Sequence, residues 1–287
     1  MDIVIIPAWA RPGFLAVTLE QIEKADGFKN LFYLFNLDVG YNPEIEVVIM
    51  DFIKRTNVQF EINRVLPTGY KVGKQSFALM CGYQWAIDKL EAQYIHLIED
   101  DIFIRQDYFR WHYAVHADRP DIFCSIASRN NNANDPVNGR EDGYYLKGGD
   151  YQSLGVCWSR RSLAHVLSYV EDAYFRDPVS FCAENFPNSK IGRFYAEQDG
   201  LIRRILEKKE AMVAWPHKPR CFHAGFEGYN RRGKEILPLE LNKQVEFIKK
   251  VCFSDEAMRQ MAVHPEHYLD SSPIDMEVGE WTTQTLQ

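Results

Sequence analysis

The segment Tyr94-Ile95-His96-Leu97-Ile98-Glu99-Asp100-Asp101 decides the fold class of this sequence. Its first five residues suit a buried strand, and three carboxylates follow at once. A short apolar run of this kind is typical of a strand in a parallel sheet that helices cover on both faces. Ligands of such sheets bind beyond the carboxyl ends of the strands. We therefore expect a ligand site at Glu99-Asp100-Asp101, called the acidic triplet below.

The chain around this strand alternates between strand-like and helix-like patterns. Short apolar runs predict strands, and apolar residues at helical spacing predict helices. The expected strands are 3–6, 31–37, 58–65, 94–98 and 122–127, with another opening the segment 153–170. The expected helices are 14–24, 44–55, 74–90, 107–118, the later part of 153–170, and 199–209. This alternation predicts an α/β domain with a mostly parallel central sheet and helices on both faces.

Composition excludes several classes of protein. Of the 287 residues, 46% are hydrophobic and 25% are charged, which is the balance of a globular protein with a buried core. The net charge of −7 argues against a protein that binds nucleic acid mainly through charge. Six dispersed cysteines without a Cys-x-x-Cys pair argue against a zinc ribbon and a disulfide framework. No signal segment and no apolar run near the ~18 residues of a membrane span is visible, so we expect a cytoplasmic protein without a membrane span.

The acidic triplet suggests a metal site. Adjacent carboxylates repel one another, and a bound cation relieves that repulsion. Their oxygen atoms suit Mg²⁺ or Mn²⁺, either of which can neutralise a diphosphate. The alternative is a solvated acidic turn. The apolar strand before the triplet favours a ligand site, because it places the acids where α/β sheets bind ligands.

The elements up to the triplet resemble the first half of GT-A fold glycosyltransferases. The Glu-Asp-Asp form of the triplet is similar to the D-x-D motif of inverting enzymes of the N-acetylglucosaminyltransferase I / family 2 type. The resemblance implies a single GT-A type domain and a nucleotide-sugar donor, with a UDP-sugar preferred. It implies that Asp101 binds Mn²⁺ (or Mg²⁺) and that Glu99 or Asp100 contacts the ribose, while these two residues share the ribose and a metal-bound water between them. The remaining residues implied for the nucleotide pocket are Pro7, Ala8, Arg11, Asp38, Lys71 and Lys74.

A second resemblance concerns Glu197-Gln198-Asp199 and Arg203. Inverting GT-A enzymes carry a Glu-Asp pair that opens a helix, with an arginine four residues on; here Gln198 replaces the usual glutamate. The resemblance implies that Asp199 is the general base, with Glu197 in reserve. A carboxylate at a helix start is stabilised as an anion and can still accept a proton from a hydroxyl. The alternative is that Asp199 only caps the helix, a role that Asp suits well.

Later segments supply further candidates. His223 resembles the late second metal ligand of GT-A enzymes, and Arg231 could pair with the diphosphate. Gly155 and Trp158 resemble the strand beside the donor sugar, although core packing is an alternative for Trp158. His112 and His116 lie four residues apart on a helix, and since no third zinc ligand is visible we interpret them as surface histidines.

The resemblance implies a division of roles along the chain. We expect a nucleotide-sugar-binding half, 1–128, an acceptor-binding and catalytic half, 129–263, and a peripheral acidic tail, 264–287. Within the second half, residues 129–150 are rich in Asn, Gly and Asp and predict a long loop.

The function implied is a metal-dependent, inverting transfer of a sugar to a hydroxyl acceptor. Glycans, proteins, small molecules and modified DNA stay open as acceptors, and so does the oligomeric state. Three alternatives also stay open. They are a phage-type enzyme that glycosylates hydroxymethylated DNA bases, a non-catalytic protein that binds a nucleotide-sugar or glycan, and a nucleotidyltransferase.

Overall fold

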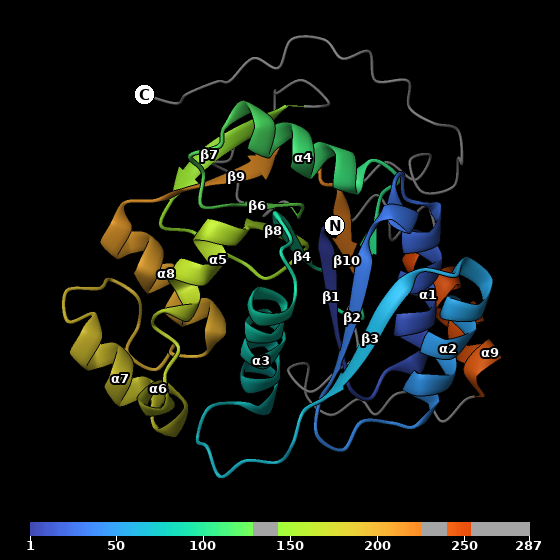
Figure 1. Ribbon diagram of the computed structural model, residues 1–287, viewed down its shortest axis with the longest axis horizontal. Coiled ribbons are helices and arrows are strands. Elements are labelled where there is room, and N and C mark those ends of the chain that lie inside the picture. The colour runs from blue at the N-terminus through green and yellow to red at the C-terminus, as the bar shows by residue number, and fades with distance from the viewer. Residues whose placement is uncertain (129–142, 225–239, 254–287) are drawn as a thin grey trace.

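A single sheet built by both the earlier and the later parts of the chain forms the centre of the fold. The computed structural model describes residues 1–128, 143–224 and 240–253. The strands of the main sheet are β1 (Ile3–Ala8), β2 (Phe32–Leu37), β3 (Gln59–Arg64), β4 (Tyr94–Leu97), β6 (Cys124–Ile126), β7 (Tyr144–Gly148), β8 (Val156–Ser159) and β9 (Met212–Pro216). They lie in the order β3-β2-β1-β4-β8-β6-β9-β7 (Figure 1).

The strands of this sheet run mostly parallel. β3, β2, β1 and β4 pair in parallel, as do β6 and β9. β8 and β7 run antiparallel to their neighbours. A small second sheet consists of β5 (Ile102–Ile104) and β10 (Cys221–His223), which pair antiparallel. The predicted mostly parallel sheet is therefore confirmed.

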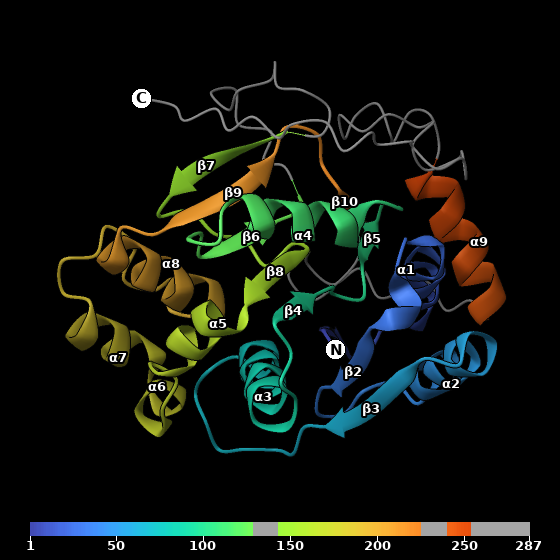
Figure 2. The same cartoon turned by 45° about the horizontal axis from the view of Figure 1, so that its top comes forward.

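Helices cover both faces of the main sheet (Figure 2). The helices are α1 (Pro12–Lys24), α2 (Glu44–Thr56), α3 (Lys74–Lys89), α4 (Tyr108–Asp118), α5 (Arg160–Leu167), α6 (Asp172–Arg176), α7 (Pro178–Asn185), α8 (Gln198–Lys209) and α9 (Leu241–Cys252), with a short 3₁₀ turn at Phe28–Asn30. Side chains of α1 and α2 pack in one cluster, and those of α3, α5 and α8 pack in another. None of the helices in the described part of the chain has the length and apolarity that a membrane span requires.

The apolar sequence of β1 explains why helices are needed on both sides. Ile3 and Ile5 belong to the cluster that contains the core side chains of α3, whereas Val4 and Ile6 belong to the cluster that contains those of α1. All four side chains are completely buried. Burying an aliphatic side chain of this size contributes about 1.5–3 kcal/mol, so a strand that is apolar at every position is stable only between two layers.

Most of the predicted elements agree with the structure to within a few residues at their ends. The loop predicted for 129–150 is wrong in part, because Tyr144–Gly148 forms a strand that pairs with β9. Residues 129–142 and the tail 264–287 lie outside the described residues.

The interpretation of His112 and His116 as surface histidines is wrong. Both side chains are buried between α4 and the sheet. Nδ1 of His112 lies 2.7 Å from the hydroxyl of Ser125, and Nε2 of His116 lies 3.2 Å from the carbonyl oxygen of Cys157. Burial lowers the pKa of His116 to about 4. The two histidines are therefore neutral polar groups of the core.

Candidate active site

The acidic triplet lies in the turn that leaves β4. The amide of Ile98 donates to the carbonyl of Ile5 at 3.0 Å, which extends the pairing of β4 with β1 by one residue. The amide of Ile102 then donates to the carbonyl of Glu99 at 3.0 Å and closes the turn before β5. The register of β5 with β10 places His223 opposite Ile102. A late segment of the chain is thereby brought beside the triplet.

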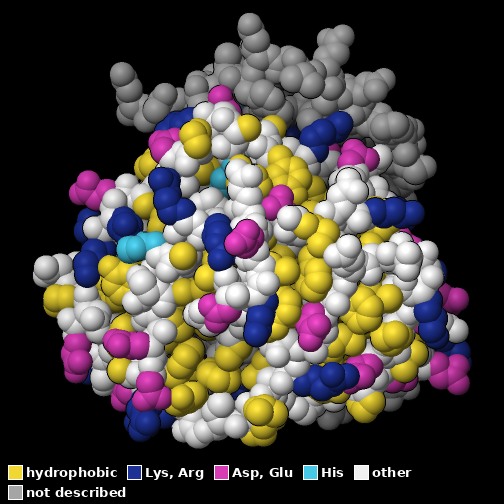
Figure 3. Space-filling view, in the orientation of Figure 1, with side chains coloured by type: hydrophobic (Ala, Val, Ile, Leu, Met, Phe, Trp, Pro, Cys, Tyr) yellow, Lys and Arg dark blue, Asp and Glu magenta, His cyan; other side chains and the backbone are white. Residues whose placement is uncertain are grey.

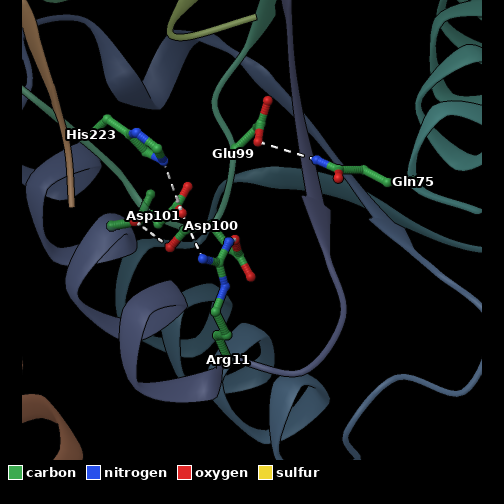
Figure 4. A network of polar contacts seen from close by, with 7 residues as sticks. Arg11, Gln75, Glu99, Asp100, Asp101 and His223 are labelled. Atoms are coloured by element: carbon green, nitrogen blue, oxygen red, sulfur yellow. Dashed lines mark hydrogen bonds and ion pairs between the residues drawn. The ribbon is translucent and has the colours of Figure 1, made fainter. Parts of the chain in front are cut away.

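Arg11, which directly precedes α1, joins the last two acids of the triplet (Figure 4). One guanidinium nitrogen lies 2.6 Å from Oδ2 of Asp101, and the other is hydrogen-bonded to Oδ1 of Asp100. Nε2 of His223 lies 3.3 Å from the same Oδ2 of Asp101. Oδ1 of Asp101 is buried and has no hydrogen-bond partner in the described structure. One carboxylate therefore has an arginine and a histidine on one oxygen and an unsatisfied second oxygen.

The three acids differ in how readily they ionise. Burial opposes ionisation of Asp101, but the hydrogen bond from His223 and the charge of Arg11 outweigh it and lower the pKa to about 2. Burial raises the pKa of Asp100 to about 6, although Arg11 acts in the opposite direction. Burial and the neighbouring charge of Asp101 raise the pKa of Glu99 to about 8. Asp101 is the strongest acid of the three, because it alone has both basic partners.

The donor set at Asp101 fits the divalent cation that the resemblance implies. The unsatisfied Oδ1 of Asp101 offers an oxygen ligand, and the imidazole of His223 offers a nitrogen ligand close by. A carboxylate with an imidazole suits Mn²⁺, and ions of this kind commonly complete their coordination with phosphate oxygens and water. Within the described ranges, no group of three or more His, Cys, Asp or Glu side chains converges on one point. The protein thus offers part of a coordination shell here.

A buried hydroxyl lies near both the triplet and the candidate base. Ser153, in the segment between β7 and β8, lowers the pKa of both Glu99 and Asp199 through its side chain. Its side chain is buried. On the opposite side of Glu99, Nε2 of Gln75 lies 3.5 Å from Oε2. Ser153 was not predicted, because it belongs to no motif and only the folded chain brings it close to the two acids.

Asp199 stands in the first turn of α8 and does not cap it. Glu197 occupies the residue before the helix, and its side chain makes no capping bond; its carboxylate instead accepts from the amide of Gly73 at 3.1 and 3.2 Å. Oδ1 of Asp199 is buried without a hydrogen-bond partner among the described residues. Burial raises the pKa of Asp199 to about 6, against the charge of Arg203 and the hydrogen bond with Ser153. The alternative that Asp199 only caps the helix is therefore wrong.

Gln198 has a structural role in the position where the resemblance expects a glutamate. The side-chain oxygen Oε1 of Gln198 accepts a hydrogen bond from the hydroxyl of Ser76. The backbone amide of Gln198 lies 3.4 Å from the same hydroxyl. Both side chains are buried. Gln198 thereby fastens the start of α8 to α3.

The predicted nucleotide pocket is brought together in part. The amide of Asp38 donates to the carbonyl of Ala8 at 3.1 Å, because Asp38 and Pro7-Ala8 end the neighbouring strands β2 and β1. Burial raises the pKa of Asp38, while the nearby charge of Lys74 lowers it. Lys71 lies apart from this group, since its ammonium lies 3.5 Å from Asp177 and its side chain is 74% exposed.

Trp9 joins this group without having been predicted. Its side chain is 42% exposed, and its indole nitrogen donates to the carbonyl of Val39 at 3.2 Å. The signal in the sequence is an aromatic residue directly after a buried strand.

The remaining candidates are either in the core or outside the described residues. Trp158 is completely buried, and its indole nitrogen donates to the hydroxyl of Tyr83 at 3.2 Å. Trp158 is therefore a core residue, as the alternative interpretation of its position expected. Gly155 has φ of +68°, and a Cβ there would lie 2.9 Å from Sγ of Cys221. The group that approaches Gly155 closely is therefore the side chain of Cys221, which belongs to the protein itself. Arg231 lies outside the described residues.

The fold resembles those of solved glycosyltransferases. Residues 1–349 of S. aureus TarS, in complex with UDP-GlcNAc, match with a TM-score of 0.50 and 10% identity, over 88% of this chain and 67% of that one. The mannosyltransferase PcManGT from Pyrobaculum calidifontis, in complex with GDP-Man and Mn²⁺, matches with a TM-score of 0.53 and 10% identity, over 91% of this chain and 72% of that one. No protein-family model and no curated protein matches the sequence. The chain therefore has an α/β fold of the GT-A glycosyltransferase type.

Proposed function

We propose that the protein transfers a sugar from a nucleotide diphosphate donor to a hydroxyl acceptor, with inversion at the anomeric carbon. A UDP-sugar is the preferred donor in this proposal. We assign residues 1–128 to donor binding and 129–263 to acceptor binding and catalysis. The acceptor can be a glycan, a protein, a small molecule or modified DNA.

The observation that carries the proposal is the carboxylate of Asp101, which has Arg11 and His223 on one oxygen and an unsatisfied buried second oxygen. A transferase of this kind needs a base within reach of the donor's anomeric carbon, and the donor's diphosphate needs positive charge beside it. Asp199, about a hundred residues further along the chain, also has an unsatisfied buried oxygen. The side chain of Ser153 influences both Glu99 of the triplet and Asp199, which supports a single site.

Asp199 acts as the general base in this mechanism. The acceptor hydroxyl gives its proton to the Asp199 carboxylate while its oxygen forms a bond to the anomeric carbon. The bond from that carbon to the diphosphate oxygen breaks, and the nucleoside diphosphate leaves with the electron pair. The raised pKa of Asp199, about 6, makes it a stronger base than an exposed aspartate and leaves it ionised at neutral pH.

The leaving diphosphate needs charge neutralisation. Asp101 and His223 would hold Mn²⁺ (or Mg²⁺), which supplies positive charge that offsets the charge on the leaving group. The fit of the donor set at Asp101 supports this assignment. The solved structures with UDP-GlcNAc and with GDP-Man and Mn²⁺ support a nucleotide-sugar as the donor.

The test is a panel of nucleotide-sugars with Mn²⁺, scored by thermal shift and by release of the nucleoside diphosphate. A donor that binds raises the unfolding temperature by mass action. We expect release by the wild type that falls at least about a hundredfold in Asp199→Asn, because general-base catalysis contributes roughly 10²–10⁴-fold. Asp101→Asn should lose the dependence on Mn²⁺. Asp51→Asn is the control, since the Asp51 side chain is 58% exposed on α2.

Three results would contradict the proposal. Equal release by the wild type and Asp101→Asn excludes the assigned site. Donor binding without release in any variant identifies a non-catalytic protein that binds a nucleotide-sugar. Release of pyrophosphate from a nucleoside triphosphate would instead identify a nucleotidyltransferase.

A further inference from the structure

Two aromatic side chains project from the segment that leads into α8. Phe194 is 84% exposed and Tyr195 is 43% exposed. Contiguous exposed apolar area often marks a site where a ligand or partner binds, so two neighbouring exposed rings are candidates for such contact. We call Phe194 and Tyr195 the aromatic platform.

The backbone beneath the platform is fixed by Arg204. This arginine of α8 is buried, and its guanidinium donates to the carbonyls of Gly200, Gly192 and Ile191 at 3.0, 2.9 and 3.3 Å, and also to the carbonyl of Tyr195. A charged side chain is buried only where its hydrogen bonds are well satisfied. The platform is therefore carried by a segment that is tied down before any ligand arrives.

Gly200 makes this arrangement possible. A Cβ at Gly200 would lie 2.0 Å from the carbonyl oxygen of Tyr195. The segment with the platform consequently runs directly across the first turn of α8. Side chains placed in advance bind a ligand without the cost of ordering them afterwards.

The platform adjoins the candidate base. The guanidinium of Arg203 lies 5.8 Å from the centroid of the Tyr195 ring. The same guanidinium lies 3.7 Å from Asp150, and its charge acts on Asp199. Asp199 in turn acts electrostatically on Tyr195. A ligand that rests on Tyr195 thus lies near the first turn of α8, the turn that carries Asp199.

We propose that the aromatic platform binds a carbohydrate acceptor, with one face of a sugar ring against Phe194 and Tyr195 and a ring hydroxyl directed at Asp199. A pyranose has an apolar face of C–H groups and a rim of hydroxyls, so it fits an exposed ring that borders a carboxylate. This inference rests on the proposed function and names the acceptor class of that same site.

A nucleic-acid acceptor fits the surface less well. The net charge is −7, and on the face drawn in Figure 3 the Lys and Arg side chains are scattered among Asp and Glu side chains. Binding to a polyanion draws on a basic track that neutralises phosphates. Arg203, the cation beside Tyr195, already has Asp150 as a partner. These observations favour a neutral sugar over DNA.

The first experiment measures acceptor binding on the full chain without any donor. Saturation-transfer NMR with methyl β-glycosides of common hexoses and N-acetylhexosamines reports contact with the sugar alone, because these probes carry no aromatic group. Dissociation constants are then compared between the wild type, Phe194→Ala, Tyr195→Ala and Phe194→Trp. Val47→Ala is the control, because Val47 is 55% exposed on α2, on the other side of the molecule from α8 (Figure 1).

We expect at least one glycoside to bind the wild type and to lose about tenfold or more in affinity in Phe194→Ala and Tyr195→Ala. Phe194→Trp keeps a ring and should stay within about twofold of the wild type, as should Val47→Ala. The unfolding temperature of Phe194→Ala should match that of the wild type to within about 2 °C, since the side chain is exposed.

Three results would overturn the inference. The first is that the wild type binds no glycoside, and the second is that the wild type and Phe194→Ala bind a glycoside equally well. The third is that Phe194 is needed for binding a DNA duplex with hydroxymethylated cytosine and not for binding a glycoside. Hydrolysis of the donor without acceptor separates the inference from the proposed function. If donor hydrolysis depends on Asp101 but glycoside binding does not depend on Phe194, the proposed function holds and the inference about the platform is wrong. If glycoside binding depends on Phe194 but donor hydrolysis does not depend on Asp101, the inference holds and the proposed function is wrong.

Discussion

At the scale of single residues, Ser153 connects the two chemical parts of the site. Its hydrogen bond favours the ionised form of Asp199, while burial favours the neutral form and dominates. A base must be ionised to accept a proton, so activity should fall on acidification through the pKa of Asp199, about 6. In the proposed mechanism, burial on one side and the charge of Arg203 with the hydrogen bond of Ser153 on the other set the acid limit of the reaction.

Replacing Ser153 should move that limit. Ser153→Ala removes a hydrogen bond to the carboxylate, which raises the pKa of Asp199 further and shifts the acid limb of kcat/KM upward by about 0.5–1 pH unit. The measurement is the pH profile of nucleotide release from pH 4.5 to 8.5. Ser168→Ala, on the exposed end of α5, should leave the profile in place. An unshifted limb in Ser153→Ala would show that Asp199 is not the group that titrates.

Arg11 is the residue that balances the charge of the triplet. Its side chain is 19% exposed and contacts carboxylates that are 7% and 4% exposed. Removing one partner of a largely buried ion pair leaves the other charge without compensation. We expect Arg11→Met to lose about 2–4 kcal/mol of unfolding free energy, or roughly 5–15 °C.

A cation should restore part of that loss. Mn²⁺ should raise the unfolding temperature of Arg11→Met by more than it raises that of the wild type, because Asp100 and Asp101 then have no arginine beside them. Differential scanning fluorimetry with and without Mn²⁺ measures both effects. Arg55→Met is the matched control, since the pair of Arg55 with Glu23 is exposed and should be worth at most about 1 kcal/mol. Equal Mn²⁺ shifts in the wild type and Arg11→Met would argue against a cation at the triplet.

At the scale of elements, the first turn of α8 depends on a glycine. Replacing a helical glycine by alanine ordinarily stabilises a helix by about 0.5–1 kcal/mol. At Gly200 the sign should reverse, because the new Cβ meets the backbone of Tyr195 at 2.0 Å. We expect Gly200→Ala to destabilise the protein by about 1–3 kcal/mol and to weaken glycoside binding, since the segment below the platform must move.

The comparison variant for this prediction is Gly192→Ala. No atom lies within 4 Å of a Cβ at Gly192, so this variant should unfold near the wild-type temperature and keep glycoside binding. Thermal unfolding and the NMR titration provide the two readouts. A stabilised Gly200→Ala would mean that the segment is free to move away from the helix.

The elements also show what sequence alone could predict. β1, β2, β4 and α3 followed from apolar periodicity, and the acidic triplet was expected at the end of β4. β5 and β10 were not predicted, because three-residue strands give no periodic signal and depend on each other for pairing. The burial of His112 escaped prediction for a related reason: its partner, the hydroxyl of Ser125, comes from another element of the fold.

At the scale of the whole molecule, the sheet explains why the site could be predicted only in part. The sequence indicates which residues end strands, and residues that end parallel strands gather at one edge. The positions of Asp38 and the triplet can be predicted in this way. The positions of Ser153 and the platform cannot, because both lie in segments whose course is fixed by tertiary contacts such as those of Arg204. Fold and triplet were therefore accessible from sequence, whereas Ser153 and the platform required the structure.

The antiparallel strand β8 between β4 and β6 has a consequence for synthesis of the chain. β4 carries the triplet, and its neighbours are β1 and β8, the latter formed by residues far along the sequence. A nascent chain that has emerged only as far as Ser128 therefore exposes one side of β4 as an open edge, which is a template for wrong pairing. Closing that edge requires a contact between distant residues, and such contacts form slowly. The strands of the first part of the chain therefore stay exposed at one edge during synthesis until the residues of β8 have emerged from the ribosome and paired with β4.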